Sequence, residues 1–164
     1  MGWWSAAVMG GDEPLDYQLE ILALLGYTYD DYTEFWVDGK LREEIKKEIA
    51  ERFEKAHDEI GEWAAQTGGI AYQALGVEMM GYGLPISPEF RALIVQAAEE
   101  DEWAAEQRAN PAGQQDRVQA MQSLISDIQK YQDGTPTELS EPDIGLLNTI
   151  FTAILDGKTG LVNR

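Results

Sequence analysis

The single histidine of the chain, His57, stands between two carboxylates: Glu54 precedes it by three residues and Asp58 follows it directly. A Glu-x-x-His pair on one helix is how carboxylate-bridged di-iron proteins present two of their metal ligands. Those sites need a second such pair, which a chain with one histidine cannot supply. We therefore expect His57 to face solvent and expect no resident cofactor. A small metal-dependent hydrolase built on carboxylates and His57 stays as an alternative.

A second pair of acids lies in a stretch rich in aromatic residues. Paired carboxylates near aromatic rings are typical of glycosidases, but adjacent residues in a loop usually point apart. The stretch suits a partner-facing loop, in which rings give rigid contact area and acids set the orientation. In an equally open alternative, the rings turn into the core and the acids stay outside. The residues predicted to bind a partner here are Asp30, Asp31, Tyr32, Glu34 and Trp36.

A third group of acids forms an unbroken run farther along the chain. Such a run is usually a solvated helix face. Like charges one turn apart weaken a helix, and a basic partner would relieve that repulsion. The run is therefore added to the predicted partner-binding surface, with the members Glu99, Glu100, Asp101 and Glu102.

Familiar catalytic motifs are missing from the sequence. The chain has no Cys, which excludes thiol catalysis, disulfides and thiolate metal sites. Its Gly-rich stretches lack the lysine and flanking strand of a phosphate-binding loop. A Ser-His-Asp triad would have to be built on His57 alone. The sequence therefore favours a non-enzymatic protein.

Charge narrows the class of partner. The 164 residues carry a net charge of −18, from 12 basic and 30 acidic residues. A surface this negative repels phosphate and anionic membranes, so we expect neither direct nucleic-acid binding nor membrane binding. Residues 1–38 contain eight acids and no Lys or Arg. The predicted partner is therefore a basic protein surface, and without a signal peptide or spanning segment the predicted location is the cytoplasm.

Helical spacing of apolar residues dominates the sequence, and no run alternates as a strand should. The clearest helix is predicted from Lys40 to Gln66. A nearly uncharged segment follows and predicts a buried central helix, in which Gly76 permits close contact with a neighbour. The six predicted helices cover residues 13–25, 40–66, 70–82, 88–109, 111–131 and 140–155.

Capping residues mark the predicted helix ends. Asp12 and Ser87 are predicted N-caps with a proline in the following turn, Gly26 ends the first helix, and Ser140 opens the last one. Residues 1–11 are predicted to pack on the body as an irregular segment, and residues 157–164 to form a short tail. The predicted fold is an irregular all-α single domain over residues 1–164.

The opening sequence MGWWSAAVMGGDEPLDY is similar to that of small proteins encoded in tailed-phage and bacterial genomes. The later stretch LPISPEF…AAEEDEWAAE resembles a later part of the same group, so the likeness spans half of the chain. The family has no assigned activity, and the resemblance implies a phage origin without a mechanism. The residues that carry the opening resemblance are Gly2, Trp3, Trp4, Gly10, Gly11, Asp12, Pro14, Leu15 and Asp16.

Charge and resemblance together predict a non-enzymatic acidic protein-binding module. In its sharper form, this is a phage-encoded inhibitor that mimics DNA and blocks a nucleic-acid-handling or defence protein in the host cytoplasm. A homo-oligomeric structural protein is the remaining alternative. Its self-interface would be the MGWW segment or the GIAYQALGVEMMGYG helix.

Overall fold

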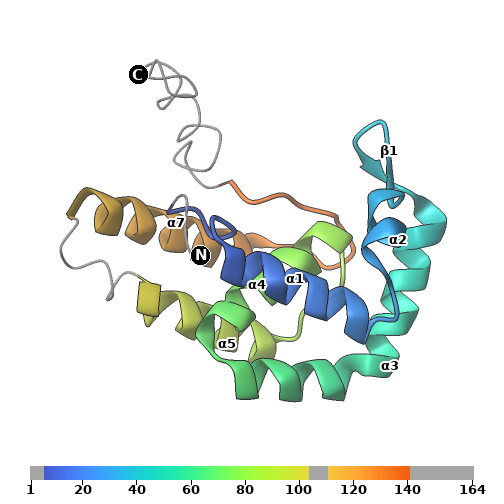
Figure 1. Ribbon diagram of the computed structural model, residues 1–164, viewed down its shortest axis with the longest axis horizontal. Coiled ribbons are helices and arrows are strands. Elements are labelled where there is room, and N and C mark those ends of the chain that lie inside the picture. The colour runs from blue at the N-terminus through green and yellow to red at the C-terminus, as the bar shows by residue number, and fades with distance from the viewer. Residues whose placement is uncertain (1–5, 104–110, 141–164) are drawn as a thin grey trace.

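The computed structural model describes residues 6–103 and 111–140 and confirms the all-α class (Figure 1). Five predicted helices have counterparts, while the sixth, the tail, Trp3 and Trp4 lie outside the described residues. None of the described helices is long and apolar enough to cross a membrane. The elements are α1 (Asp12–Leu24), α2 (Tyr29–Thr33), β1 (Trp36–Val37), β2 (Lys40–Leu41), α3 (Glu43–Thr67), α4 (Gly69–Tyr82), α5 (Pro88–Glu99) and α7 (Pro111–Lys130).

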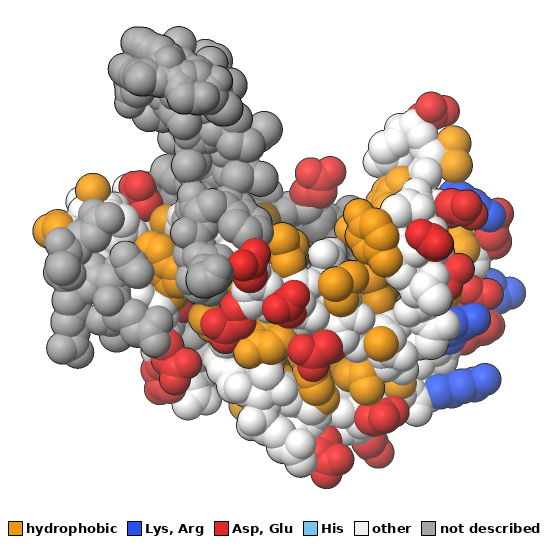
Figure 2. Space-filling model, viewed as in Figure 1, with side chains coloured by type: hydrophobic (Ala, Val, Ile, Leu, Met, Phe, Trp, Pro, Cys, Tyr) orange, Lys and Arg blue, Asp and Glu red, His pale blue; other side chains and the backbone are white. Residues whose placement is uncertain are grey.

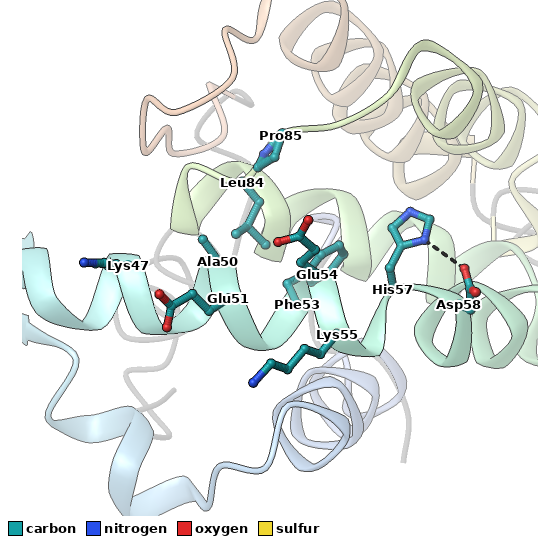
Figure 3. Close-up of a pocket in the computed structure, with 10 residues that line it drawn as sticks. All are labelled: Lys47, Ala50, Glu51, Phe53, Glu54, Lys55, His57, Asp58, Leu84 and Pro85. Atoms are coloured by element: carbon teal, nitrogen blue, oxygen red, sulfur yellow. Dashed lines mark hydrogen bonds and ion pairs between the residues drawn. The ribbon is translucent and has the colours of Figure 1, made fainter.

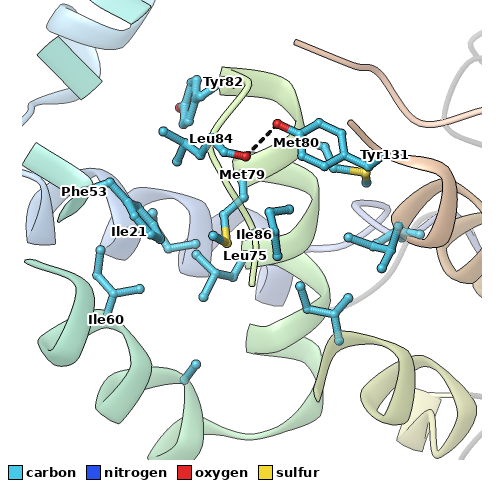
Figure 4. Close-up of a cluster of buried hydrophobic side chains, with 14 of the residues drawn as sticks. Ile21, Phe53, Ile60, Leu75, Met79, Met80, Tyr82, Leu84, Ile86 and Tyr131 are labelled. Carbon is cyan, nitrogen blue, oxygen red and sulfur yellow. Dashed lines mark hydrogen bonds between the residues drawn. The ribbon is translucent and has the colours of Figure 1, made fainter. Parts of the chain in front are cut away.

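The nearly uncharged helix α4 is the centre of the fold, as predicted. It packs against α1, α3, α5 and α7, and ten of its fourteen residues are buried. A Cβ atom at Gly76 would lie 3.0 Å from Cγ2 of Ile94, so α5 crosses α4 at contact distance there. The core around α4 takes side chains from its neighbours, including Ile21, Phe53, Ile60, Leu84, Ile86 and Tyr131 (Figure 4).

The helix predicted from Lys40 begins later because a hairpin precedes it. Trp36 pairs with Leu41 across two short antiparallel strands. Asp38 and Gly39 both have positive φ, 54° and 77°, as a tight hairpin turn requires. The prediction that the chain has no strand is therefore wrong here, and the Asp-Gly pair is the sequence signal of this hairpin.

Two other helix boundaries also differ from prediction. Gly11 is the N-cap of α1, and Asp12 is its first residue rather than its cap. The helix expected to reach residue 109 ends at Glu99, because the chain turns there and sends Asp101 into the interior. The start of α5 is confirmed, since the Ser87 side chain accepts a hydrogen bond from the backbone N–H of Phe90 at 3.1 Å.

The segment after α7 returns across the end of α4 without regular structure, as predicted for residues 132–139. The backbone N–H of Thr137 donates to the carbonyl of Met80 at 2.7 Å. The Tyr131 hydroxyl donates to the carbonyl of Leu84 at 2.7 Å (Figure 4). These bonds fix the segment against the C-terminal end of α4.

Candidate binding surface

All eight acids of residues 1–38 are exposed, on α1, α2 and the hairpin. We call the exposed surface of these elements the acidic–aromatic face. Figure 2 shows acids among hydrophobic side chains over α1, while Lys and Arg side chains gather along the edge formed by α3. The acids of this face are Asp12, Glu13, Asp16, Glu20, Asp30, Asp31, Glu34 and Asp38.

Exposed apolar side chains concentrate on the same face. Five large hydrophobic residues are exposed in the described part of the chain, and three of them lie here. Leu19 is 45% exposed, Tyr29 61% and Val37 58%. The other two, Leu93 and Val118, lie on α5 and α7. Apolar contact area is therefore combined with negative charge on one surface.

The aromatic rings divide between the core and the face, so each sequence-based alternative holds for some of them. Phe35 is 1% exposed and Tyr27 is buried. Tyr32 and Trp36 are half-buried, with ring centroids 5.1 Å apart in an edge-on contact. Tyr29 is exposed and lies 6.0 Å from Tyr32 between centroids. Buried rings thus fix the position of the rings that reach the surface.

Asp31 has a structural task besides its charge. Its Oδ2 accepts a hydrogen bond from the backbone N–H of Thr28 at 2.8 Å, and its own N–H donates to Thr28 Oγ1 at 3.1 Å. This capping box starts α2. The hydrogen bonds from Thr28 lower the pKa of Asp31. Asp30 and Glu34 are exposed and do not belong to this capping box.

The predicted acidic run is only partly a surface. Its three glutamates are exposed, but Asp101 is buried and forms an ion pair with Arg117, with Nε 2.9 Å from Oδ2. Asp101 is therefore removed from the predicted partner-binding residues. Trp103, just beyond the run, packs with Ala6 and Ile70, and Tyr17 of α1 rests against them. This end of the run thus adjoins α1.

His57 faces solvent, as predicted, with 60% of its side chain exposed and Nδ1 3.3 Å from Oδ1 of Asp58. It lines an open groove of about 610 Å³ along α3, which Leu84 and Pro85 face from the opposite side (Figure 3). The groove mixes two lysines with three acids, and its lining contains no Ser, Thr or Tyr. Among the described residues, no group of three His, Cys, Asp or Glu side chains could hold a metal ion.

Two buried polar clusters beside α4 were not predicted. In one, Arg117 and Asp101 meet Gln73 of α4. In the other, Glu78 of α4 accepts a hydrogen bond from Gln18 of α1. A usable signal existed for the second cluster, since Glu78 is the only charged residue between residues 68 and 88. For Arg117 the sequence gives no comparable signal, because it lies in a helix with ordinary polar neighbours.

No protein-family model, curated protein or solved structure matches this chain. The similarity to phage and bacterial proteins therefore stays a prediction from the sequence.

Proposed function

We propose that this chain is a protein-binding module that docks its acidic–aromatic face on a basic protein surface. One observation carries the proposal. Three of the five exposed large hydrophobic residues of the described chain lie among eight exposed acids, in a segment without Lys or Arg before residue 40. Exposure of apolar side chains is costly in water, and their grouping on one face favours a contact surface.

The two kinds of residue would divide the work of binding. Large side chains such as Leu19 and Tyr29 supply apolar area at the centre of an interface, where most binding energy is concentrated. The surrounding carboxylates steer a basic partner and set its orientation, and salt weakens their effect. The half-buried rings of Tyr32 and Trp36 hold the apolar area in place, because their inner edges are packed in the core.

A narrower form of the proposal concerns the class of partner. Proteins that handle nucleic acids present Lys and Arg in an arrangement that matches phosphate charges. A protein face that carries closely spaced carboxylates suits the same surface and would compete with DNA for it. The similarity to phage proteins adds that the partner would be a host protein.

The apolar part is tested by capture from a bacterial lysate on the immobilised chain. Leu19→Ser with Tyr29→Ser should remove the specifically captured protein. A matched control changes the two exposed hydrophobic residues elsewhere, Leu93→Ser with Val118→Ser, and should keep it. Equal capture by both double variants, or loss with the control only, would contradict the proposed face.

The narrower form is tested with the captured partner and a labelled DNA duplex. The chain should displace DNA from the partner, and the Leu19→Ser/Tyr29→Ser variant should not. A captured partner that binds no DNA would overturn the nucleic-acid-handling form and leave the proposed face intact. Light scattering of the free chain separates the self-association alternative, because a stable oligomer lost in the same variant would make a second copy the partner.

A further inference from the structure

Glu78 is a buried carboxyl group whose hydrogen-bond partners are all neutral. It is 7% exposed. Its Oε2 accepts from the side-chain amide of Gln18 at 2.9 Å, and its Oε1 accepts from the Tyr82 hydroxyl at 2.8 Å. Within the described part of the chain, no Lys, Arg or His forms an ion pair with Glu78. A carboxylate buried in this way lacks the compensation that a cation would provide.

The hydrogen bonds of Glu78 join the helices that form the acidic–aromatic face. Gln18 belongs to α1, and the same Nε2 atom also lies 3.3 Å from the Tyr32 hydroxyl of α2. The Tyr32 ring in turn packs on Phe35 and Trp36, with centroids 5.6 and 5.1 Å away. The carboxyl group of Glu78 on α4 is therefore connected through Gln18 to both α1 and α2.

The titratable groups that face Glu78 are tyrosines. Tyr82 lies one turn farther along α4 and Tyr32 lies on α2. Tyr27 interacts electrostatically with Tyr82 and helps to raise the pKa of Tyr82. Among the described residues, α1 contributes only the neutral Gln18, and α3, α5 and α7 contribute no charged group. Burial raises the pKa of Glu78 to about 7, although hydrogen bonds from Tyr82 and Gln18 lower it. Burial also raises the pKa of Tyr82, so its hydroxyl keeps its proton.

We propose that Glu78 is a proton-binding site that controls how firmly α1 and α2 are held on α4. When Glu78 is protonated, its neutral carboxyl group can donate to the Tyr82 oxygen and accept from Gln18. When it releases the proton to solvent, a full negative charge remains in an apolar interior. Water relieves that charge only if Gln18 moves away from α4, which loosens α1 and the contact to Tyr32. The proposal concerns the free protein and does not depend on the proposed function.

The direct test follows the Glu78 side-chain carboxyl carbon by NMR in the full chain between pH 4 and 9. We expect its titration midpoint between pH 6 and 8. Glu44 is the reference within the molecule, because the hydrogen bond from Arg42 lowers its pKa and its titration ends at lower pH. A Glu78 midpoint below pH 5.5 would overturn the proposal.

Two substitutions test the hydrogen bonds. Tyr82→Phe removes a donor to Glu78 and should move the midpoint to higher pH, whereas Tyr29→Phe, on the exposed surface, should leave it unchanged. An unchanged midpoint in Tyr82→Phe would contradict the assigned geometry. Both substitutions keep the aromatic ring and its packing, so the comparison isolates the hydroxyl group.

The loosening itself is measured by amide hydrogen exchange of α1 and by the ring signals of Tyr32 and Trp36. In the wild-type chain the protection of the α1 amides, corrected for the intrinsic pH dependence of exchange, and the ring signals should both change at the Glu78 midpoint, and in Glu78→Gln neither should. The same pH dependence in Glu78→Gln would refute the control of α1 and α2 by this group. A His57→Gln background removes the only imidazole from the comparison. If Glu78→Gln does not fold, the wild-type midpoint and the Tyr82→Phe shift still decide the question.

Discussion

Among the described residues, two carboxyl groups are buried, Glu78 on α4 and Asp101 beside it, and their surroundings differ in one respect. The Asp101 carboxylate accepts hydrogen bonds from Nε and Nη2 of Arg117, at 2.9 and 3.1 Å, and from the side-chain amide of Gln73 at 2.9 Å. The Glu78 carboxyl group accepts hydrogen bonds from two neutral donors, the side-chain amide of Gln18 and the hydroxyl of Tyr82. In the Asp101 cluster, the buried guanidinium of Arg117 compensates the negative charge of the carboxylate. In the Glu78 cluster no cation does so, and binding of a proton removes the charge.

The two clusters also hold different parts of the chain. Arg117 reaches the carbonyls of Ala6 and Ala7, at 3.3 and 2.7 Å, and thereby ties the segment before α1 to α7. Glu78 lies beneath the acidic–aromatic face, through Gln18 and Tyr32. The part of the molecule proposed to bind a partner is therefore the part whose anchoring depends on pH.

The largest effect is expected from Arg117→Met. The substitution removes the guanidinium that is paired with the buried Asp101, and it removes donors from Gln73 and two backbone carbonyls. Loss of one member of a buried ion pair costs about 3–5 kcal/mol. Urea unfolding should show this loss, with Lys55→Met on the surface of α3 as the control. A loss below about 1 kcal/mol, typical of surface ion pairs, would show that the two clusters do not differ as described.

Glu78→Gln should act in the opposite direction at high pH. Because the folded-state pKa is raised above the unfolded value of 4.5, to about 7, the folded protein holds the proton more tightly. Wild-type stability therefore falls as pH rises through this window and levels off above it. One pKa unit corresponds to about 1.4 kcal/mol, so removing the charge should gain up to about 3 kcal/mol at pH 8.

Urea unfolding at several pH values tests this gain. The difference between Glu78→Gln and wild type should be small at pH 4 and grow toward pH 8. Asp58→Asn, at a fully exposed position on α3, is the control for removing one negative charge. A Glu78→Gln difference that stays constant with pH would show that burial does not penalise this carboxylate.

Gln18→Ala should have a smaller effect that also depends on pH. A hydrogen bond to a neutral group contributes about 1 kcal/mol. Because Gln18 is proposed to move away from α4 when Glu78 is ionised, the loss of stability should be larger at pH 5, where the bond is formed, than at pH 8. Gln96→Ala serves as the control, because the Gln96 side chain makes a long, exposed hydrogen bond to Glu100 at 3.4 Å. A loss from Gln18→Ala that is equal at both pH values would separate Gln18 from the titration of Glu78.

The smallest effect on stability is expected at the surface. Tyr29→Ser removes a ring that is 61% exposed, so the free energy of unfolding should change by less than about 0.5 kcal/mol. Thermal unfolding measures this change beside Tyr32→Ser, whose half-buried ring should cost more. A large loss in Tyr29→Ser would assign that ring to the core instead of the face.

Much of the fold follows from local sequence patterns. Apolar spacing predicts α3, the lack of charge predicts the buried α4, and the Ser87 cap and Gly76 contact are confirmed. The end of α5 was not predictable, because its cause is Arg117, sixteen residues beyond Asp101 in sequence. The run of acids predicts that Asp101 faces solvent, and only its tertiary contact with Arg117 shows that it points inward.

The acidic–aromatic face was predicted in part. Concentration of acids before residue 40 is visible in the sequence, and the structure exposes all eight of them. The sequence does not show which rings are buried, because the burial of Phe35 and the exposure of Tyr29 depend on tertiary packing. The spacing of Leu15, Leu19, Leu22 and Leu25 predicts one apolar stripe on the first helix, and only the structure shows that Leu19 is 45% exposed.

The most direct test of the proposed face is the salt dependence of affinity for the captured partner. The variant Asp16→Asn/Asp30→Asn/Glu34→Gln neutralises three acids of the face and leaves the Asp31 cap intact. Glu54→Gln/Asp58→Asn/Glu89→Gln makes the same change in net charge elsewhere. The face variant should bind more weakly and with a shallower dependence on salt, whereas the control should behave as wild type. Equal slopes for the two triple variants would show that net charge, and not this face, determines binding.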